Sequence, residues 1–263
     1  MLRGAPIIHR GTLERLEESL NPPYVVDDGE SLSLHFEATL VQSRMLKAEP
    51  ARLVCEYTRT MMGFLLLAPA PRRIAMIGLG GGSLAKACTS LLPDVAFLAI
   101  ERSPEVIALR DTFGIPPDGP RFQALCADGA EWVRGNDVVD VLLVDGFDGH
   151  GQPKQLCTTE FYGACYARLL PGGVLVVNLN ADETGYGTYV RRIRDAFGAN
   201  IRVVRTEDDN NKIVFALKDA AFPSREQLEA RAAAFPDVLG AVAGRMAEGR
   251  RREPLLAPPR LRT

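Results

Sequence analysis

Short hydrophobic runs alternate with amphipathic stretches through the middle of the chain. Five runs have the length of strands buried in a parallel sheet: residues 74–77, 95–100, 122–126, 138–144 and 174–178. Helical spacing of apolar positions marks four other stretches: residues 84–92, 104–112, 159–169 and 186–197. Two last runs, 201–205 and 213–217, are typical of a hairpin. We therefore predict an α/β fold with a doubly wound, mostly parallel, Rossmann-like sheet of seven strands that carries helices on both faces.

The first part of the chain has a different pattern. Asp27-Asp28-Gly29 is a turn signal between two alternating runs, 24–26 and 32–36, which predicts a half-buried hairpin. Residues 39–42 are expected to add a third strand. Pro50 is expected to open a helix that continues through Leu66, because the N–H that proline lacks has no partner in a first helical turn.

The last part of the chain changes composition twice. From Pro223 it is rich in Ala, Arg and Glu, which predicts a helix, and after Glu248 it is rich in Pro and Arg, which predicts a solvated tail. We therefore expect three regions: a small N-terminal β-hairpin region at 1–48, a Rossmann-like catalytic domain at 49–222, and a C-terminal helix and tail at 223–263.

Composition narrows the class of protein. The chain has 263 residues, 46% of them hydrophobic, which is enough for a substantial core. Its formal net charge of −2 gives no electrostatic reason to expect nucleic acid or an anionic membrane as a partner. The longest apolar stretch, 61–70, is far shorter than the roughly 20 residues that span a bilayer. No long apolar run follows Arg3, so we expect no secretory signal and a cytoplasmic protein.

The five cysteines are scattered along the chain: Cys55, Cys88, Cys126, Cys157 and Cys165. None of them forms a C-x-x-C pair, so the sequence predicts neither a zinc site nor a disulfide framework, and we expect no metal cofactor. Reduced thiols fit a cytoplasmic protein.

A glycine-rich turn joins the first predicted strand of the sheet to the helix that follows. Gly78, Gly80 and Gly82 alternate in this turn. Glycine lets the backbone turn tightly and lets a ligand approach where a Cβ atom would clash. The spacing departs from the dinucleotide fingerprint G-x-G-x-x-G because Ser83 takes the third position, although the frame from Gly80 to Ala85 fits the G-x-G-x-x-A variant. The turn is therefore either a nucleotide site or only a tight connection.

Two acidic residues follow the next two predicted strands. Glu101 ends the second strand, roughly 20 residues past the glycine turn, where an acid accepts hydrogen bonds from ribose hydroxyls. Asp128, followed by Gly129, closes the third strand beside the same crevice. Asp128 is placed either to reach an adenine amino group or to cap the next helix.

Asp145 and Asp148 follow the fourth predicted strand, which we expect to lie beside the first. Ligands of open α/β sheets bind at the carboxyl ends of the strands near this point. Two carboxylates there can attract a cationic amine and accept its proton, which leaves the nitrogen lone pair free to attack. The alternative is that both residues cap a glycine-rich loop.

From about Leu34 to Leu217 the chain resembles the spermidine synthase (polyamine aminopropyltransferase) family, a branch of the class I methyltransferase-like fold. The matching segments follow the family's order: Leu40-Val41-Gln42, Ile77 to Gly82, Glu101, Ala127-Asp128-Gly129, Asp145-Gly146-Phe147-Asp148 and Pro171-Gly172-Gly173. The resemblance implies that the following residues bind the donor: Gln42, Gly78, Gly80, Gly82, Glu101, Asp128 and Gly129. It also implies catalytic roles for Asp145, as the base, and Asp148, with Tyr57 and Asp148 binding the substrate.

The chain departs from the family pattern on one side of this site. Gly81 stands where the family loop carries an Asp that helps to hold the donor's free amine. The family's Tyr-(Gln/His)-Glu-Met segment is represented by Tyr57-Thr58-Arg59-Thr60, so a cation replaces an acid. Asp208 or a neighbour stands where the family has a Tyr. We expect Arg59 to repel a diamine if it faces the acceptor.

The resemblance implies a transferase that moves an aminopropyl group from decarboxylated S-adenosylmethionine to a small-molecule amine. A methyltransferase that uses intact S-adenosylmethionine is the alternative, because the loss of the loop Asp removes a charge that would repel the donor's carboxylate. A non-catalytic nucleotide-binding module is a second alternative. The exposed strand edge expected in the N-terminal region favours a homodimer or a larger assembly.

Overall fold

Seven strands form the large sheet of the computed structural model, which describes residues 6–9, 23–36, 41–147, 151–182 and 184–248. The order is β10-β11-β9-β8-β5-β6-β7. The strands are β5 (Arg73–Ile77), β6 (Ala96–Glu101), β7 (Phe122–Cys126), β8 (Val139–Val144), β9 (Leu169–Asn180), β10 (Ile201–Arg205) and β11 (Asn211–Leu217). Strands β5 to β9 pair in parallel, and β11 is antiparallel to both of its neighbours. The predicted doubly wound, mostly parallel sheet is confirmed.

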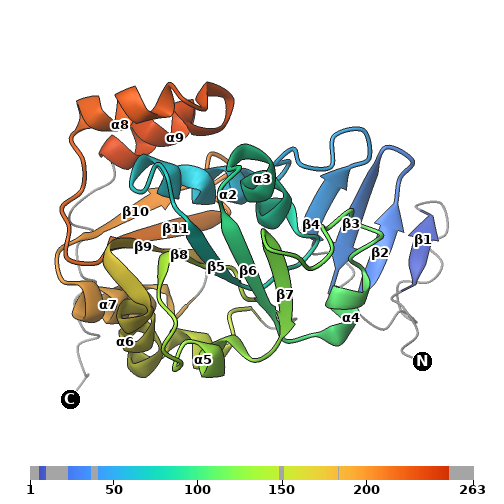
Figure 1. Cartoon of the computed structure of the whole chain (residues 1–263), viewed down its shortest axis with the longest axis horizontal. Coiled ribbons are helices and arrows are strands. Elements are labelled where there is room, and N and C mark those ends of the chain that lie inside the picture. Colours follow the sequence, from blue (N-terminus) through green and yellow to red (C-terminus); the bar gives the residue numbers. More distant parts are fainter. Residues whose placement is uncertain (1–5, 10–22, 37–40, 148–150, 183, 249–263) are drawn as a thin grey trace, which may run out of the picture.

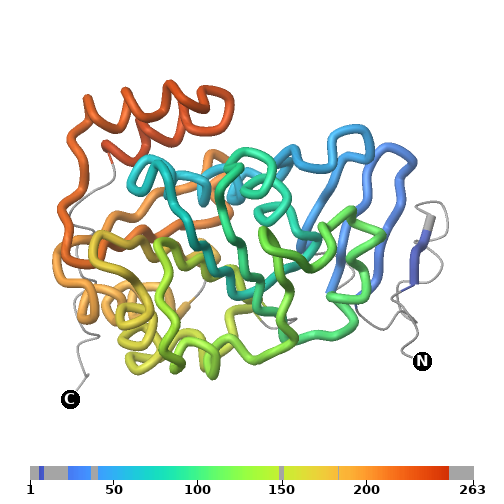
Figure 2. Tube along the Cα trace, viewed as in Figure 1, coloured from blue at the N-terminus to red at the C-terminus, as the bar shows by residue number. Residues whose placement is uncertain are grey.

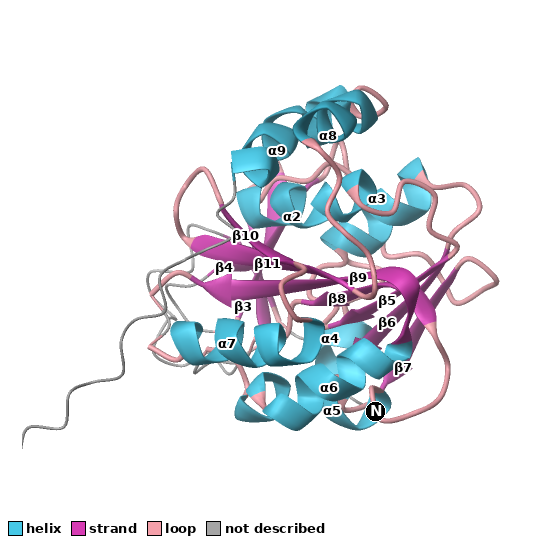
Figure 3. Cartoon of the chain, turned by 90° about the vertical axis from the view of Figure 1, so that its left-hand side faces the viewer, coloured by secondary structure: helices cyan, strands magenta, loops and turns pink. Residues whose placement is uncertain are grey.

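Helices cover both faces of this sheet (Figures 1 and 3). On one face lie α2 (Glu56–Met61), η2 (Met62–Leu66), α3 (Ser83–Leu91), α8 (Arg225–Ala232) and α9 (Pro236–Glu248). On the other lie α5 (Gly129–Trp132), α6 (Thr159–Arg168) and α7 (Tyr186–Phe197). Two hydrophobic clusters fill the spaces between the helices and the two faces of the sheet. The short α4 (Pro104–Ala108) follows β6, and η3 (Lys154–Cys157) precedes α6.

A separate four-stranded sheet is formed by the N-terminal region. Its order is β1-β2-β3-β4, with β1 (Ile7–His9), β2 (Tyr24–Asp27), β3 (Ser31–His35) and β4 (Val41–Leu46). The predicted hairpin is therefore present, and Asp28 closes its turn by accepting the main-chain N–H of Ser31 at 2.6 Å. The third strand expected at 39–42 corresponds at 41–42 to β4 (Val41–Leu46), and residues 39 and 40 lie outside the described residues.

The helix predicted from Pro50 begins only at Glu56. Residues 50–55 form a turn and an extended segment, and the guanidinium of Arg59 donates to the main-chain oxygens of Leu53 and Val54. A side chain therefore satisfies carbonyl groups that a longer helix would have used internally. The last part of the predicted helix, from Met62 to Leu66, is the 3₁₀ helix η2.

The predicted C-terminal helix is two helices. α8 ends near Ala232, and Pro236 starts α9, because proline provides no N–H to continue a helix and disfavours helical geometry in the residue before it. Figure 2 traces the chain from the small sheet, in blue, to this helical pair, in red. α9 packs against α2 and η2. The boundaries predicted at 48/49 and 222/223 stay predictions.

No helix in the described part of the chain is both long enough and apolar enough to cross a membrane.

Candidate active site

A cavity of about 730 Å³ opens at the carboxyl ends of β5, β6, β8 and β9, where β4 and α2 close it on one side. β5 pairs with both β6 and β8, so the direction of strand succession reverses at this point of the sheet. The cavity brings together eight of the residues predicted from the sequence: Gln42, Tyr57, Gly78, Gly80, Glu101, Asp128, Gly129 and Asp145. Asp148 lies outside the described residues.

The glycine turn passes very close to the end of β8. Gly78 has a positive φ of 92°, and a Cβ atom at this position would lie 2.3 Å from the main-chain oxygen of Asp145. Gly80 lines the cavity with a φ of 52°. Gly82 is not among the lining residues; it starts α3 in the left-handed conformation, and a Cβ there would collide with Ile115. The turn therefore needs its glycines for backbone reasons, and two of them also leave an open surface for a ligand.

Glu101 holds the glycine turn in place. Its Oε2 accepts the main-chain N–H of Leu79 and its Oε1 accepts that of Ser103, both at 2.9 Å. The residue is only 8% exposed, yet it lines the cavity. A carboxylate has about four acceptor positions, so Glu101 can accept ribose hydroxyls while it keeps both main-chain contacts.

Asp128 is the N-cap of α5. Its Oδ1 accepts the main-chain N–H groups of Ala130 and Glu131, so the capping interpretation is confirmed, and the residue also lines the cavity. The next residue must be small, because a Cβ at Gly129 would lie 2.4 Å from Ile77. The two interpretations of Asp128 are therefore compatible, since the cap uses one carboxylate oxygen.

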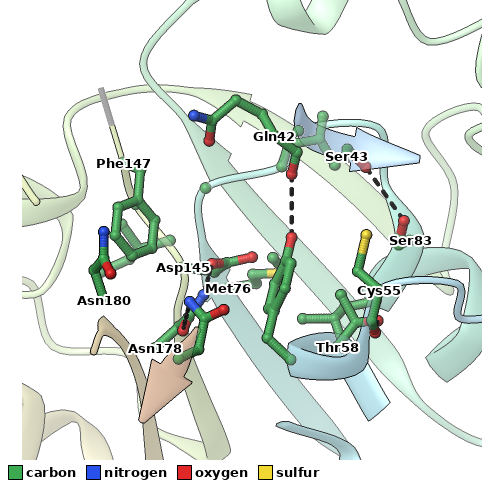
Figure 4. A pocket seen from close by; sticks show the side chains of 18 of the residues that line it. Gln42, Ser43, Cys55, Thr58, Met76, Ser83, Asp145, Phe147, Asn178 and Asn180 are labelled. Atoms are coloured by element: carbon green, nitrogen blue, oxygen red, sulfur yellow. Dashed lines mark hydrogen bonds between the residues drawn. The ribbon is translucent and has the colours of Figure 1, made fainter. Parts of the chain in front are cut away.

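Asp145 is a half-buried residue whose carboxyl group lies in the cavity (Figure 4). Burial raises its pKa to about 6, although hydrogen bonding with Asn178 and Tyr57 acts in the opposite direction. The Nδ2 of Asn178 donates to Oδ1 of Asp145 at 2.8 Å. The hydroxyl of Tyr57 has a single proton, which it can donate either to Asp145 or to the main-chain oxygen of Gln42, 3.2 Å away; the bond to Gln42 joins β4 to α2 across the cavity. A carboxyl group with a pKa near 6 can take up and release a proton close to neutral pH.

Several cavity residues were missed by sequence analysis. Asn178 and Asn180 both line the cavity and alternate at the end of β9, where the strand leaves the core. The sequence did hold a signal for these two asparagines, because polar side chains at the carboxyl end of a buried parallel strand indicate a binding site. Ser43 and Ser83, whose hydroxyl oxygens lie 3.3 Å apart, and Cys55 had no signal, because each depends on how β4 and α2 pack against the sheet.

Arg59 was expected to repel a diamine, but its neighbours in the structure offset its charge. Arg59 lines the cavity, but its guanidinium is paired with Glu56 at 2.5 Å and also donates to two carbonyl groups. Glu56 lines the cavity too, with its side chain 8% exposed. The acid of this segment therefore stands one position before Tyr57, and it offsets the charge of Arg59.

Gly81, the other departure, lies under the cavity wall. A Cβ at this position would lie 2.7 Å from the Ser43 hydroxyl and 3.0 Å from the ring of Phe113. A larger residue here would have to displace one of these side chains. Asp208 lines the cavity, as do Asp182 and Asn210.

The described residues contain no group of three or more His, Cys, Asp or Glu side chains placed to hold a metal ion. All five cysteines are free.

The sheet order and the position of the cavity define a protein of the class I methyltransferase-like fold. A probable spermidine synthase from Corynebacterium glutamicum superposes with a TM-score of 0.68 at 19% identity, over 90% of this chain and 95% of that one. Human methyltransferase-like protein 13, solved in complex with SAH, superposes with a TM-score of 0.63 at 23% identity, over 71% of this chain and 93% of that one. These similarities show the fold.

Sequence similarity identifies the family within this fold. No family model matches the chain. A polyamine aminopropyltransferase from Chromobacterium violaceum is 36% identical over 217 residues, which cover 81% of this chain and 82% of that protein. The chain belongs to the polyamine aminopropyltransferase family. It is a transferase, and its activity is aminopropyl transfer.

Proposed function

We propose that the chain transfers the aminopropyl group of decarboxylated S-adenosylmethionine to a small-molecule amine, with Asp145 as the catalytic base. One observation carries the proposal: the carboxyl group of the half-buried Asp145 lies at the end of β8, inside the cavity, and loss of solvent contact raises its pKa to about 6. Such a group is ionised at neutral pH and basic enough to accept a proton from a bound ammonium group.

The transfer itself needs one proton acceptor and no redox partner. Asp145 takes a proton from the acceptor's ammonium group, and the freed nitrogen lone pair attacks the donor carbon next to the sulfonium. The C–S bond breaks as the C–N bond forms, and its electron pair stays on sulfur, which becomes the neutral thioether of methylthioadenosine. The positive charge thereby moves from sulfur to the new secondary ammonium group, and Asp145 holds the proton until it is released.

The adenosyl half of the donor is assigned to the residues around the glycine turn. Gly78 and Gly80 give open backbone for close approach, Glu101 accepts the ribose hydroxyls, and Asp128 with Gly129 faces the adenine. Gln42, at the β4 wall, contacts the donor from the other side. Tyr57 stands between this wall and Asp145, where it contacts the acceptor.

The charge of the cavity favours the decarboxylated donor over intact S-adenosylmethionine. Its described lining includes six carboxylates (Glu56, Glu101, Asp128, Asp145, Asp182 and Asp208) and two guanidinium groups (Arg59 and Arg102). Because Arg59 is already paired with Glu56, a donor carboxylate would meet mainly like charge. A sulfonium with a free amine and a cationic acceptor both match this negative cavity.

The test compares Asp145→Asn with the control Asp94→Asn, an exposed carboxylate whose nearest cation, Arg72, is 3.8 Å away. Release of methylthioadenosine is followed with decarboxylated donor and a panel of diamines that includes putrescine. We expect Asp145→Asn to lose 10²-fold or more of the activity, on the order of a general base's contribution, while Asp94→Asn stays active. An active Asp145→Asn variant would overturn the role of Asp145. Methyl transfer from intact S-adenosylmethionine, without methylthioadenosine, would favour the methyltransferase alternative instead.

We further propose that the protein is a homodimer or a larger assembly formed through the small sheet, since exposed sheet edges pair readily with a second chain. A monomeric mass in light scattering would contradict this. The five free cysteines fit a reducing compartment such as the cytoplasm.

A further inference from the structure

Two asparagine side chains form a chain of hydrogen bonds behind Asp145. Asn178 of β9 donates its Nδ2–H to Oδ1 of Asp145 at 2.8 Å, and Asn211 of β11 donates its Nδ2–H to Oδ1 of Asn178 at 2.9 Å. β9 and β11 are antiparallel neighbours in which Asn211 is paired with Asn180, so Asn178 is its diagonal neighbour on the same face. Three strands of the sheet, β8, β9 and β11, therefore contribute to one line of side chains that ends at the cavity.

The direction of this chain is fixed at the Asp145 end. An ionised carboxylate only accepts hydrogen bonds, so Asp145 requires an N–H from Asn178. The amide oxygen of Asn178 then points away from the cavity, toward the N–H of Asn211. If Asn178 turned over, its oxygen would face the carboxylate and its NH₂ would face the NH₂ of Asn211, which loses both bonds. Asn211 thus holds Asn178 in the orientation that Asp145 needs.

The main chain keeps both asparagines in place. Asn178 pairs with Ile213 in the β9–β11 ladder, and its main-chain oxygen also accepts a hydrogen bond from Nε2 of Gln152 at 3.2 Å. Asn211 is held at the start of β11 by its main-chain N–H and oxygen, which both bond to the hydroxyl of Thr206. The amides are therefore supported by rigid elements, so their hydrogen bonds cost little ordering when the substrate arrives.

We propose that Asn178 and Asn211 are positioning residues for the transfer: Asn211 sets the orientation of Asn178, and Asn178 holds the Asp145 carboxylate ionised, with Oδ2 directed at the acceptor amine. This inference rests on the proposed role of Asp145 as the base. In this proposal Asn178 acts on the base and Asn211 acts through Asn178, and both asparagines also line the cavity.

The pH dependence of Asp145 also involves the other groups around it. The Tyr57 hydroxyl and the Cys55 thiol, both on the α2 side, interact with it electrostatically. Other charged residues that the structure describes also line this cavity: Glu56, Arg59, Glu101, Arg102, Asp128, Asp182 and Asp208. Substitutions at Asn178 and Asn211 leave all of these in place, so a change in the pH profile reports the amide chain.

The experiment measures kcat/KM against pH for Asn178→Ala, Asn211→Ala and the double variant, with decarboxylated donor and one diamine. The substrates are the same throughout, so a shift between variants comes from the enzyme. A carboxylate that loses a hydrogen-bond donor becomes harder to ionise, so we expect the acid limb to move up by about one pH unit in Asn178→Ala. Asn211→Ala should move it in the same direction by about half as much.

The double variant separates a positioning role from a merely structural one. Because Asn211 acts through Asn178, Asn211→Ala should add no further shift once Asn178 is alanine. Asn200→Ala, half-buried before β10 and outside the cavity lining, should leave the limb unchanged. If Asn178→Ala does not fold, Asn178→Asp keeps the shape, and we expect a larger upward shift, because two adjacent carboxyl groups share one proton.

The outcomes keep the two proposals apart. An unmoved acid limb in both Asn178 variants, with Asp145→Asn inactive, overturns the amide chain and leaves the base in place. Additive shifts in the double variant overturn the role of Asn211. An active Asp145→Asn variant overturns the proposed base itself.

Discussion

Arg245 of α9 donates to the carboxylate of Glu56 on α2 at 2.8 Å, although 189 positions separate the two residues. The same guanidinium pairs with Glu207 and donates to the hydroxyl of Thr60. Glu56 lines the cavity, and Glu207 precedes Asp208, which lines it too. The C-terminal helical pair therefore holds two segments that line the active site, α2 and the turn before β11, although it contributes no described lining residue of its own.

Replacement of Arg245 by Met should destabilise the protein by about 1–2 kcal/mol. The side chain of Glu56 is nearly buried, and the substitution removes one of its two cationic partners among the described residues and leaves Arg59. A buried carboxylate that loses part of its ion pairing lowers the free energy of unfolding. Urea denaturation measures the change. Arg225→Met is the matched control, since Arg225 is 55% exposed and its nearest carboxylate lies 3.6 Å away; its change should stay within about 0.5 kcal/mol. Equal effects of the two variants would contradict a stabilising role of the ion pair between Arg245 and Glu56.

Gly78 and Gly80 should respond very differently to alanine. A methyl group at Gly78 would lie 2.3 Å from a main-chain oxygen that cannot move without β8, so we expect a loss of roughly 3 kcal/mol or more, or no folded protein. At Gly80 the nearest atom would lie 3.8 Å from the new methyl group, so there is no clash. The variant loses stability only because alanine disfavours the left-handed backbone conformation, which costs about 1–2 kcal/mol. Thermal unfolding and expression level compare them. A Gly78→Ala variant as stable as Gly80→Ala would show that the turn can relax.

The periodicity of the sequence predicted the large sheet because its central strands β5, β6 and β8 are short, nearly continuous apolar runs. The positions of Glu101, Asp128 and Asp145 followed from the fold, since parallel strands end at the same edge. In contrast, the late start of α2 depends on Arg59 reaching back to the carbonyls of Leu53 and Val54, which no local pattern shows.

Interactions between distant segments account for other features that the sequence pattern did not predict, in the core as well as in the site. Lys86 is 5% exposed, and its ammonium donates to the main-chain oxygen of Phe113 at 2.6 Å, where a helix pattern alone favours an exposed lysine. The bond from Asn211 to Asn178 depends on the register of β9 with β11, which the hydrophobic alternation of each strand leaves open by two residues.

Tyr57→Phe should slow the transfer and move its acid limb upward. The substitution keeps the ring and removes the hydroxyl that lowers the pKa of Asp145 and ties α2 to Gln42. Because that hydroxyl stabilises the ionised carboxylate, its loss should shift the limb by up to about one pH unit. Tyr166→Phe is the control, since it removes an exposed hydroxyl that donates to Asp219, and neither of these residues lines the cavity. A normal pH profile in Tyr57→Phe would show that Asn178 alone supports the charge.

Asp145→Asn should make the protein more stable at neutral pH even as it removes activity. The carboxyl has a folded-state pKa of about 6 against 3.8 when unfolded, so the folded protein binds the proton more tightly. The tighter proton binding contributes fully to the free energy of unfolding below about pH 4, and this contribution is lost as the pH rises to about 6. Asparagine is neutral at every pH, so the variant does not lose stability over this range. The gain above pH 6 should approach about 3 kcal/mol, roughly 6 °C or more in Tm. Tm measured from pH 4 to 8 tests this: the difference between Asp145→Asn and the unaltered protein should grow up to pH 6 and then level off. A constant difference across that range would mean that burial does not hold the Asp145 proton, and Asp94→Asn, being exposed, should show no such growth.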